Sequence, residues 1–106
     1  MHKLNPTKDA LEFWDSLDAK QYRQTGRKIL SLLLDPYPKD SKALIGYPEY
    51  FRVDCGEYRI IYKVEEDTIK LTLIGARNDG DVYRKFKRKL SVEQEDLNSA
   101  GQPGKL

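Results

Sequence analysis

The chain has 106 residues and a formal net charge of +2, the size of one compact domain. A single cysteine, Cys55, and a single histidine, His2, exclude an internal disulfide and a zinc site built from the usual ligands. No apolar run approaches the roughly 18 residues of a membrane span and nothing marks export, so we expect a cytoplasmic protein without membrane contact, metal or cofactor.

The first third of the chain predicts two helices. Thr7 can cap a first helix, and Asp18 can cap a second one whose apolar residues recur at three- and four-residue spacing up to Leu33. Pro36 ends the second helix, because proline lacks the amide donor and disfavours helix in the residue before it. We expect the two helices to form an αα-hairpin. His2–Leu4 is a short candidate for an opening strand.

Residues 50–75 change to a period of two and are rich in β-branched and aromatic residues. The predicted strands are Tyr50–Cys55, Tyr58–Glu65 and Thr68–Gly75. Gly56-Glu57 suits a two-residue type II′ turn with glycine first, and Glu66-Asp67 stands where a second tight turn belongs. This segment therefore predicts two consecutive hairpins.

Two-residue turns fix the predicted pairing of the strands. Across the first hairpin the pairs are Phe51 with Tyr62, Val53 with Ile60, and Cys55 with Tyr58. Across the second they are Tyr62 with Leu71, Ile60 with Leu73, and Val64 with Ile69. All these residues share one apolar face, which we expect to pack on the helices.

The opposite face of this sheet collects the charged side chains. Its predicted members are Arg52, Asp54, Arg59, Ile61, Lys63, Lys70, Thr72 and Ile74. Asp54 stands directly opposite Arg59, either as an ordinary cross-strand ion pair or as part of an anion-binding platform. Strict alternation would turn Arg77 into the core, where an unpaired guanidinium is costly. We therefore expect a bulge or strand end at Gly75 that releases Arg77 to the charged face.

A short basic helix is predicted from Gly80 or Asp81 to Leu90. Residues 1–90 carry 18 Lys and Arg against 14 Asp and Glu, and the cations are densest at Arg84–Lys89. Such a cluster can neutralise phosphates, although a solvated helix end has the same composition. Ser91–Leu106 is expected to be a flexible tail. The predicted fold class is α+β, with the αα-hairpin packed on a small twisted antiparallel sheet and residues 1–90 as one domain.

Several segments together resemble the RelE/ParE toxin superfamily. They are Gly46–Glu49, Phe51–Val53, Gly56–Tyr62, Ile74–Arg77 and Asp81–Arg84. The preceding αα-hairpin fits too, so the resemblance covers about residues 1–90. It implies a microbial RNase-like fold and a toxin with a cognate antitoxin as partner. For the RelE branch it implies a metal-independent endoribonuclease that cuts messenger RNA in the ribosomal A site, leaving a 2′,3′-cyclic phosphate.

The resemblance also implies roles for individual residues. Arg59 matches the family's central phosphate-binding arginine, and Arg77 matches the arginine near the leaving group. Tyr83 matches a tyrosine that orients or stacks on the RNA, and Arg52 matches the first of two basic positions on the preceding strand. Asp54 departs from the pattern, because many relatives have Lys or Arg there.

Three interpretations of this departure stay open. Asp54 is the general base, Glu49 is the base instead, or neither is and Asp54 neutralises Arg59 in a weak or inactive enzyme. Further contacts to messenger and ribosomal RNA are expected from Lys63, Arg84, Lys85, Lys87 and Arg88. Two other functions fit the same fold: a ParE-type inhibitor of DNA gyrase, and an inactive member that serves as the antitoxin's co-repressor.

Overall fold

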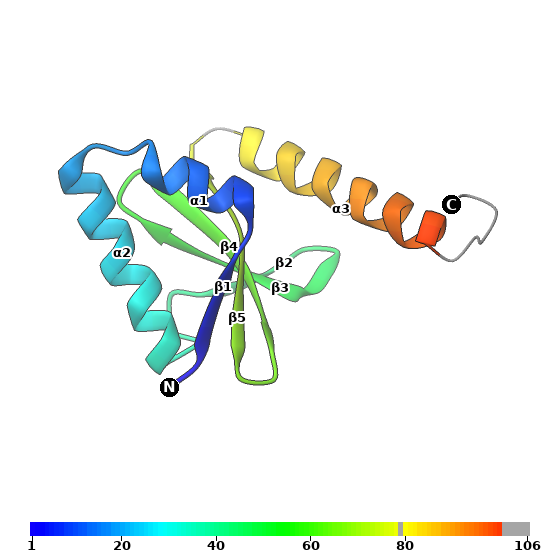
Figure 1. Ribbon diagram of the computed structural model, residues 1–106. Coiled ribbons are helices and arrows are strands. Elements are labelled where there is room, and N and C mark those ends of the chain that lie inside the picture. The colour runs from blue at the N-terminus through cyan, green and yellow to red at the C-terminus, as the bar shows by residue number, and fades with distance from the viewer. Residues whose placement is uncertain (79, 101–106) are drawn as a thin grey trace.

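The structure, a computed structural model, describes residues 1–78 and 80–100, and for residues 81 and 92–100 it describes the backbone alone. The helices are α1 (Lys8–Asp15), α2 (Ala19–Leu34) and α3 (Asp81–Ala100) (Figure 1). The strands are β1 (Lys3–Pro6), β2 (Lys42–Leu44), β3 (Tyr47–Cys55), β4 (Tyr58–Glu65) and β5 (Thr68–Ala76). The fold class is α+β, as the sequence predicts.

The two N-terminal helices begin at the predicted caps. The Thr7 hydroxyl accepts the Ala10 amide at 3.1 Å, and the Asp18 carboxylate accepts the Gln21 amide at 2.9 Å. Helix α2 ends at Leu34, just before Asp35-Pro36. The predicted αα-hairpin is confirmed. None of the helices in the described part of the chain is long and apolar enough to cross a membrane.

The five strands form one mixed sheet in the order β1-β5-β4-β3-β2. Strand β1 runs parallel to β5, and the other pairs are antiparallel. The opening strand therefore exists, but it makes the sheet mixed where an antiparallel one was expected. Strand β2, only three residues long, was not predicted.

The first hairpin has the predicted register, with Phe51, Val53 and Cys55 opposite Tyr62, Ile60 and Tyr58. Gly56 has a φ of +59°, as the first position of a type II′ turn requires. The second hairpin differs, because Ile60 pairs with Ile74 where Leu73 was expected. The register shifts between Ile61 and Tyr62, which pair with Leu73 and Leu71 and leave Thr72 as a bulged residue.

The bulge at Thr72 reverses the alternation of the rest of β5. Ile74 joins the core under α1 and α2, whereas Leu73 turns to the opposite face. Arg77 keeps the parity of Leu73 and lies on the charged face, as predicted. The bulge was expected at Gly75, but it lies three residues earlier, at Thr72.

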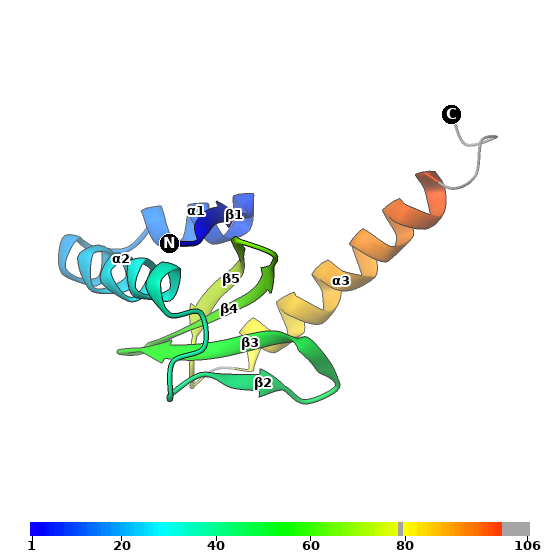
Figure 2. The ribbon, with the colours of Figure 1, turned by 90° about the horizontal axis from the view of Figure 1, so that it is seen from below.

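The sheet has an apolar core on each face. On one face Val53, Ile60 and Tyr62 pack against Ile29 and Leu32 of α2. On the other, the buried residues Leu44, Tyr50, Ile61 and Leu73 pack against Val82 and Phe86 of α3. Helices α2 and α3 lie on opposite sides of the molecule (Figures 1 and 2). The charged face is therefore partly covered by a helix and not open across its width.

Helix α3 continues ten residues beyond the predicted end at Leu90, to Ala100. The first part of the expected tail is thus helical, and residues 101–106 lie outside the described residues. The division into a domain of residues 1–90 and a tail stays a prediction.

Candidate active site

The centre of the charged face is an ion pair between neighbouring strands. Asp54 of β3 and Arg59 of β4 are direct partners near the tight turn at Gly56. The Arg59 Nε donates to Asp54 Oδ1 at 2.7 Å, and Nη2 donates to Oδ2 at 3.1 Å. Only 15% of the Arg59 side chain is exposed, so this bidentate contact is shielded from solvent. It is stronger than an exposed surface pair.

Helix α3 adds a tyrosine to this pair. The Arg59 Nη1 donates to the Tyr83 hydroxyl at 2.6 Å, and the Arg59 Cζ lies 5.6 Å from the centre of the Tyr83 ring. Val82 and Phe86, 2% and 1% exposed, fix the helix to the sheet on both sides of Tyr83. The basic helix therefore has a buried apolar side that places Tyr83 over Arg59.

Two more arginines surround the same carboxylate. Arg77 Nη1 lies 3.9 Å from Asp54 Oδ2, and the Arg77 amide donates to the Glu57 carbonyl at 2.9 Å. Arg52 stands two residues before Asp54 on the same face of β3. The Arg77 side chain is 46% exposed, so it can reach a ligand from solution.

The electrostatics follow from this crowding of cations. The hydrogen bond from Arg59, with the charges of Arg59, Arg52 and Arg77, holds the pKa of Asp54 below its ordinary value despite partial burial. The same hydrogen bond, donated to Asp54, raises the pKa of Arg59. Three permanent positive charges thus surround one carboxylate. The excess charge suits a second anion, such as a phosphate.

Glu49 does not join this group. It is exposed and precedes Asp54 by five residues in β3, a separation of about 16 Å along an extended strand. The pairing of β2 with β3 shifts register between Tyr47 and Phe51, and the charge of Glu49 acts on Lys63, where it helps to raise the lysine's pKa. Lys63, another predicted site residue, lies 5.2 Å from the ring of Tyr50 and pairs with Glu65 at 3.4 Å.

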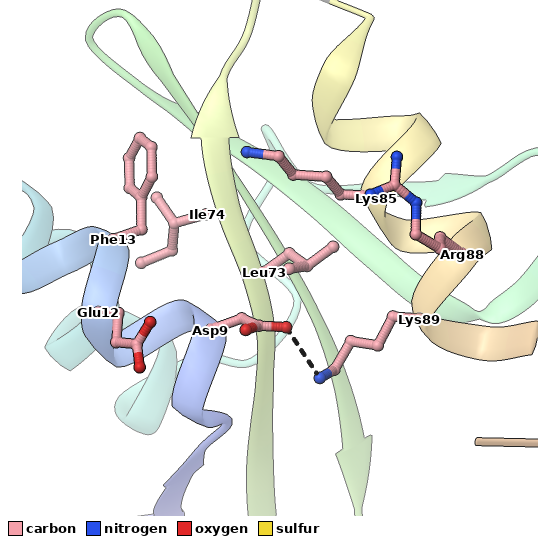
Figure 3. A pocket seen from close by; sticks show the side chains of 8 residues that line it. All are labelled: Asp9, Glu12, Phe13, Leu73, Ile74, Lys85, Arg88 and Lys89. Atoms are coloured by element: carbon pink, nitrogen blue, oxygen red, sulfur yellow. Dashed lines mark hydrogen bonds and ion pairs between the residues drawn. The ribbon is translucent and has the colours of Figure 1, made fainter. Parts of the chain in front are cut away.

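The predicted RNA-binding residues of α3 lie on two sides of the helix. Lys85 and Arg88 line a pocket of about 580 Å³ that is bounded by α1, β5 and α3 (Figure 3). Asp9 of α1 faces them, and its carboxylate pairs with Lys89 Nζ at 3.3 Å. Lys87 lines a different pocket together with Arg52 and Tyr83. Arg84, on the first turn, is exposed and has an interaction partner.

Sequence reasoning missed two residues near the site, Lys42 and Tyr47, which line the same pocket as Lys87. Lys42 belongs to a strand too short to show a pattern. Tyr47 stands in the Gly46–Glu49 segment, and that signal was available. Among the described residues no three His, Cys, Asp or Glu side chains group as ligands of a metal ion.

The chain is similar to known toxins of toxin-antitoxin systems. A family model described as ParE toxin of type II toxin-antitoxin system, parDE, matches residues 4–80. No curated protein matches the chain. The isolated E. coli RelE toxin has a similar structure, with a TM-score of 0.66, 20% identity, and coverage of 85% of this chain and 99% of its own.

Two further solved structures are similar. A mutant of the E. coli toxin RelE in the free state has a TM-score of 0.69 and 23% identity over 82% of this chain and 96% of its own. The archaeal RelE-RelB complex from Pyrococcus horikoshii gives 0.64 and 25% over 72% of this chain and 94% of its own. These likenesses establish a shared fold.

Proposed function

The chain belongs to the ParE toxin family of type II toxin-antitoxin systems, within the RelE/ParE superfamily, and from this premise we propose that it is a ribosome-dependent endoribonuclease. It cleaves messenger RNA and so inhibits translation. The observation that carries the proposal is the convergence of Arg59 and Arg77 on one anionic group, the carboxylate of Asp54. A scissile phosphate has the charge and the two non-bridging oxygens, able to accept two guanidinium N–H groups, to take the place of that carboxylate.

The proposed reaction is a transesterification within the RNA chain. The 2′-oxygen forms a bond to the adjacent phosphorus while the bond to the 5′-oxygen breaks, which leaves a 2′,3′-cyclic phosphate and a 5′-hydroxyl. One proton passes from the 2′-hydroxyl to solvent water, and one passes from solvent water to the departing 5′-oxygen. Arg59 and Arg77 stabilise the charge that develops on the pentavalent phosphate. Tyr83, in contact with Arg59, orients the RNA next to it.

We assign Asp54 a positioning role and not the role of general base. Its lowered pKa makes it a weak proton acceptor near neutrality, and its oxygens are occupied by Arg59. In the free protein it holds two guanidinium groups at one place. In the complex the phosphate replaces it on one of them. Glu49 is too far along β3 to accept a proton at this centre.

The partner follows from the same premise. Solved relatives include the complex of E. coli RelBE and the archaeal RelE-RelB complex. We propose that a cognate antitoxin binds this chain and covers Arg59 and Arg77 with acidic side chains. Contacts to messenger and ribosomal RNA are assigned to Lys63, Arg84, Lys85, Lys87 and Arg88, of which all but the half-buried Lys63 are exposed.

Inhibition of DNA gyrase without RNA cleavage is the second candidate. It is favoured by the family model, which describes ParE toxins, and by the occupation of Arg59 by Asp54. An inactive co-repressor is the third. One purified sample assayed for cleavage in translating ribosomes and for gyrase supercoiling separates the three. Cleavage supports the nuclease, loss of supercoiling supports the gyrase inhibitor, and neither leaves the co-repressor.

A further inference from the structure

A second pocket adjoins the candidate active site through Tyr83, whose hydroxyl accepts from Arg59. It has a volume of about 490 Å³ and lies between the hairpin of β2 and β3 and the first turns of α3. Arg52 and Tyr83 line both this pocket and the candidate active site. A polymer held at Arg59 therefore has the pocket next to it for a neighbouring unit.

The charge of this pocket has one sign. Lys42 and Arg52 are direct partners in the ladder of β2 and β3, and Lys87 of α3 adds a third cation. Among the residues that the structure describes, no carboxylate lines the pocket and none of these three side chains is ion-paired with a carboxylate. Like charges directly opposite each other destabilise a sheet unless an anion lies between them. The pocket beside α1 differs, because Asp9 and Glu12 line it.

The remaining walls are aromatic and apolar. Tyr47 and Tyr83 are both partly exposed, and the Tyr47 ring is held at 5.1 Å from Phe86 with an interplanar angle of 87°. Ile45 stands at the rim, 99% exposed, beside the turn at Gly46. Fixed aromatic rings next to cations are the combination that binds single-stranded nucleic acid, because bases stack on rings while phosphates meet the cations.

We propose that this pocket is a nucleotide subsite of the enzyme. It binds the nucleotide adjacent to the scissile phosphate of single-stranded RNA, with the base against Tyr47 and the phosphate between Lys42, Arg52 and Lys87. The inference rests on the proposed ribonuclease function and adds a subsite that recognises the nucleotide next to the cleaved bond. An acidic protein segment would also be attracted by the cations, and the titration therefore compares RNA with an acidic peptide of equal charge.

The test is a titration of the full chain with a short RNA that carries a 2′-O-methyl group at each sugar and is therefore not cleaved. Amide chemical shifts report binding at low and moderate salt. The variants are Lys42→Gln, Lys87→Gln, Tyr47→Leu and Tyr47→Phe, with Lys39→Gln as the matched control because Lys39 is exposed and lies outside the pocket. An acidic peptide of equal charge serves as the second probe.

The expected result is a loss of RNA affinity of about threefold to tenfold for each lysine variant, with a shallower dependence on salt by about 0.7 in the log–log slope for each lost phosphate contact. Tyr47→Leu weakens binding about tenfold, whereas Tyr47→Phe and Lys39→Gln leave it unchanged. Thermal unfolding of each variant identifies any loss of affinity that comes from unfolding. The Tyr47 ring packs on Phe86, so Tyr47→Leu can also lower the stability of the fold. The lysine variants leave this packing intact and test the pocket without that effect.

Two results would overturn the subsite. One is that Lys42→Gln and Tyr47→Leu bind the RNA as tightly as the wild type. The other is that the variants bind the acidic peptide more weakly but bind the RNA with unchanged affinity. Cleavage by the same variants in translating ribosomes separates the two proposals. If wild-type protein cleaves and Arg59→Ala does not, the ribonuclease stands whatever the pocket variants do. If the wild type neither cleaves nor binds the RNA, both proposals fail.

Discussion

Asp54, on the strand next to Arg59, accepts hydrogen bonds from the guanidinium through both carboxylate oxygens. The hydroxyl of Tyr83 accepts a third hydrogen bond from the same guanidinium. The contact holds the arginine in one orientation before any substrate arrives. It also means that a phosphate must replace a carboxylate in order to bind. The balance between these two effects decides how active the protein is, and it can be tested at one residue.

Asp54→Asn is expected to keep RNA cleavage within about tenfold of the wild type, because the amide oxygen still accepts a hydrogen bond from Arg59. RNA affinity at low salt should rise, since a competing negative charge is removed. Rates of cleavage in translating ribosomes and titration with uncleavable RNA measure the two effects. A loss of a thousandfold or more would instead identify Asp54 as the general base, and Glu49→Gln is the matched carboxylate control.

The same substitution tests the ion pair through the pH dependence of stability. The pKa of Asp54 lies below its ordinary value of 3.8 in the folded chain, so the pair stabilises the fold fully above that value and loses this contribution as the pH falls through the lowered pKa. Urea unfolding from about pH 7 to about pH 3 should show wild type more stable than Asp54→Asn, by a margin that shrinks below about pH 4. A margin independent of pH would contradict the pairing.

The hydroxyl of Tyr83 should matter separately from its ring. Tyr83→Phe removes the 2.6 Å hydrogen bond from Arg59 but keeps the aromatic ring, and we expect a loss of about 1 kcal/mol in unfolding free energy and roughly tenfold in cleavage. Tyr83→Ala also removes the contact between ring and guanidinium and should lose more. Tyr37→Phe, at an exposed tyrosine packed on Phe51, is the control and should change neither. Equal activity of all three variants would remove Tyr83 from the site.

Gly75 sets the distance between the sheet and α3. A Cβ at this position would lie 3.0 Å from both Cβ and Cγ2 of Val82, which is too close for either to stay in place. Gly75→Ala should cost about 1–3 kcal/mol of stability and reduce cleavage, because the first turn of α3 carries Tyr83. The loss should be smaller in a Val82→Ala background, where the contact is relieved. A double-mutant cycle of unfolding free energies measures this, and strict additivity would contradict it.

The sequence predicted the elements that are determined locally. The side chains of Thr7 and Asp18 cap the helices that follow them, and Gly56 allows the turn that sets the register of the first hairpin. The opposition of Asp54 and Arg59 follows from that register alone. The centre of the site was therefore predictable from residues close together in the chain.

Features that depend on distant packing were not predictable in the same way. The bulge at Thr72 turns Leu73 toward α3, and nothing in the strand's own alternation indicates this. The charge of Arg84–Lys89 also hid the four-residue spacing of Val82, Phe86 and Leu90, which is the side that packs on the sheet. Recognising that spacing would have placed α3 over the charged face and Tyr83 against Arg59.

The measurement that tests the central claim most directly is the mapping of messenger 3′ ends in a translating system supplied with the purified protein. We expect fragments that end in a 2′,3′-cyclic phosphate, with the yield reduced about 10²–10³-fold by Arg59→Ala or Arg77→Ala and unchanged by Arg27→Ala on the exposed surface of α2. Intact messenger with wild-type protein, or undiminished cutting by both site variants, would contradict the account.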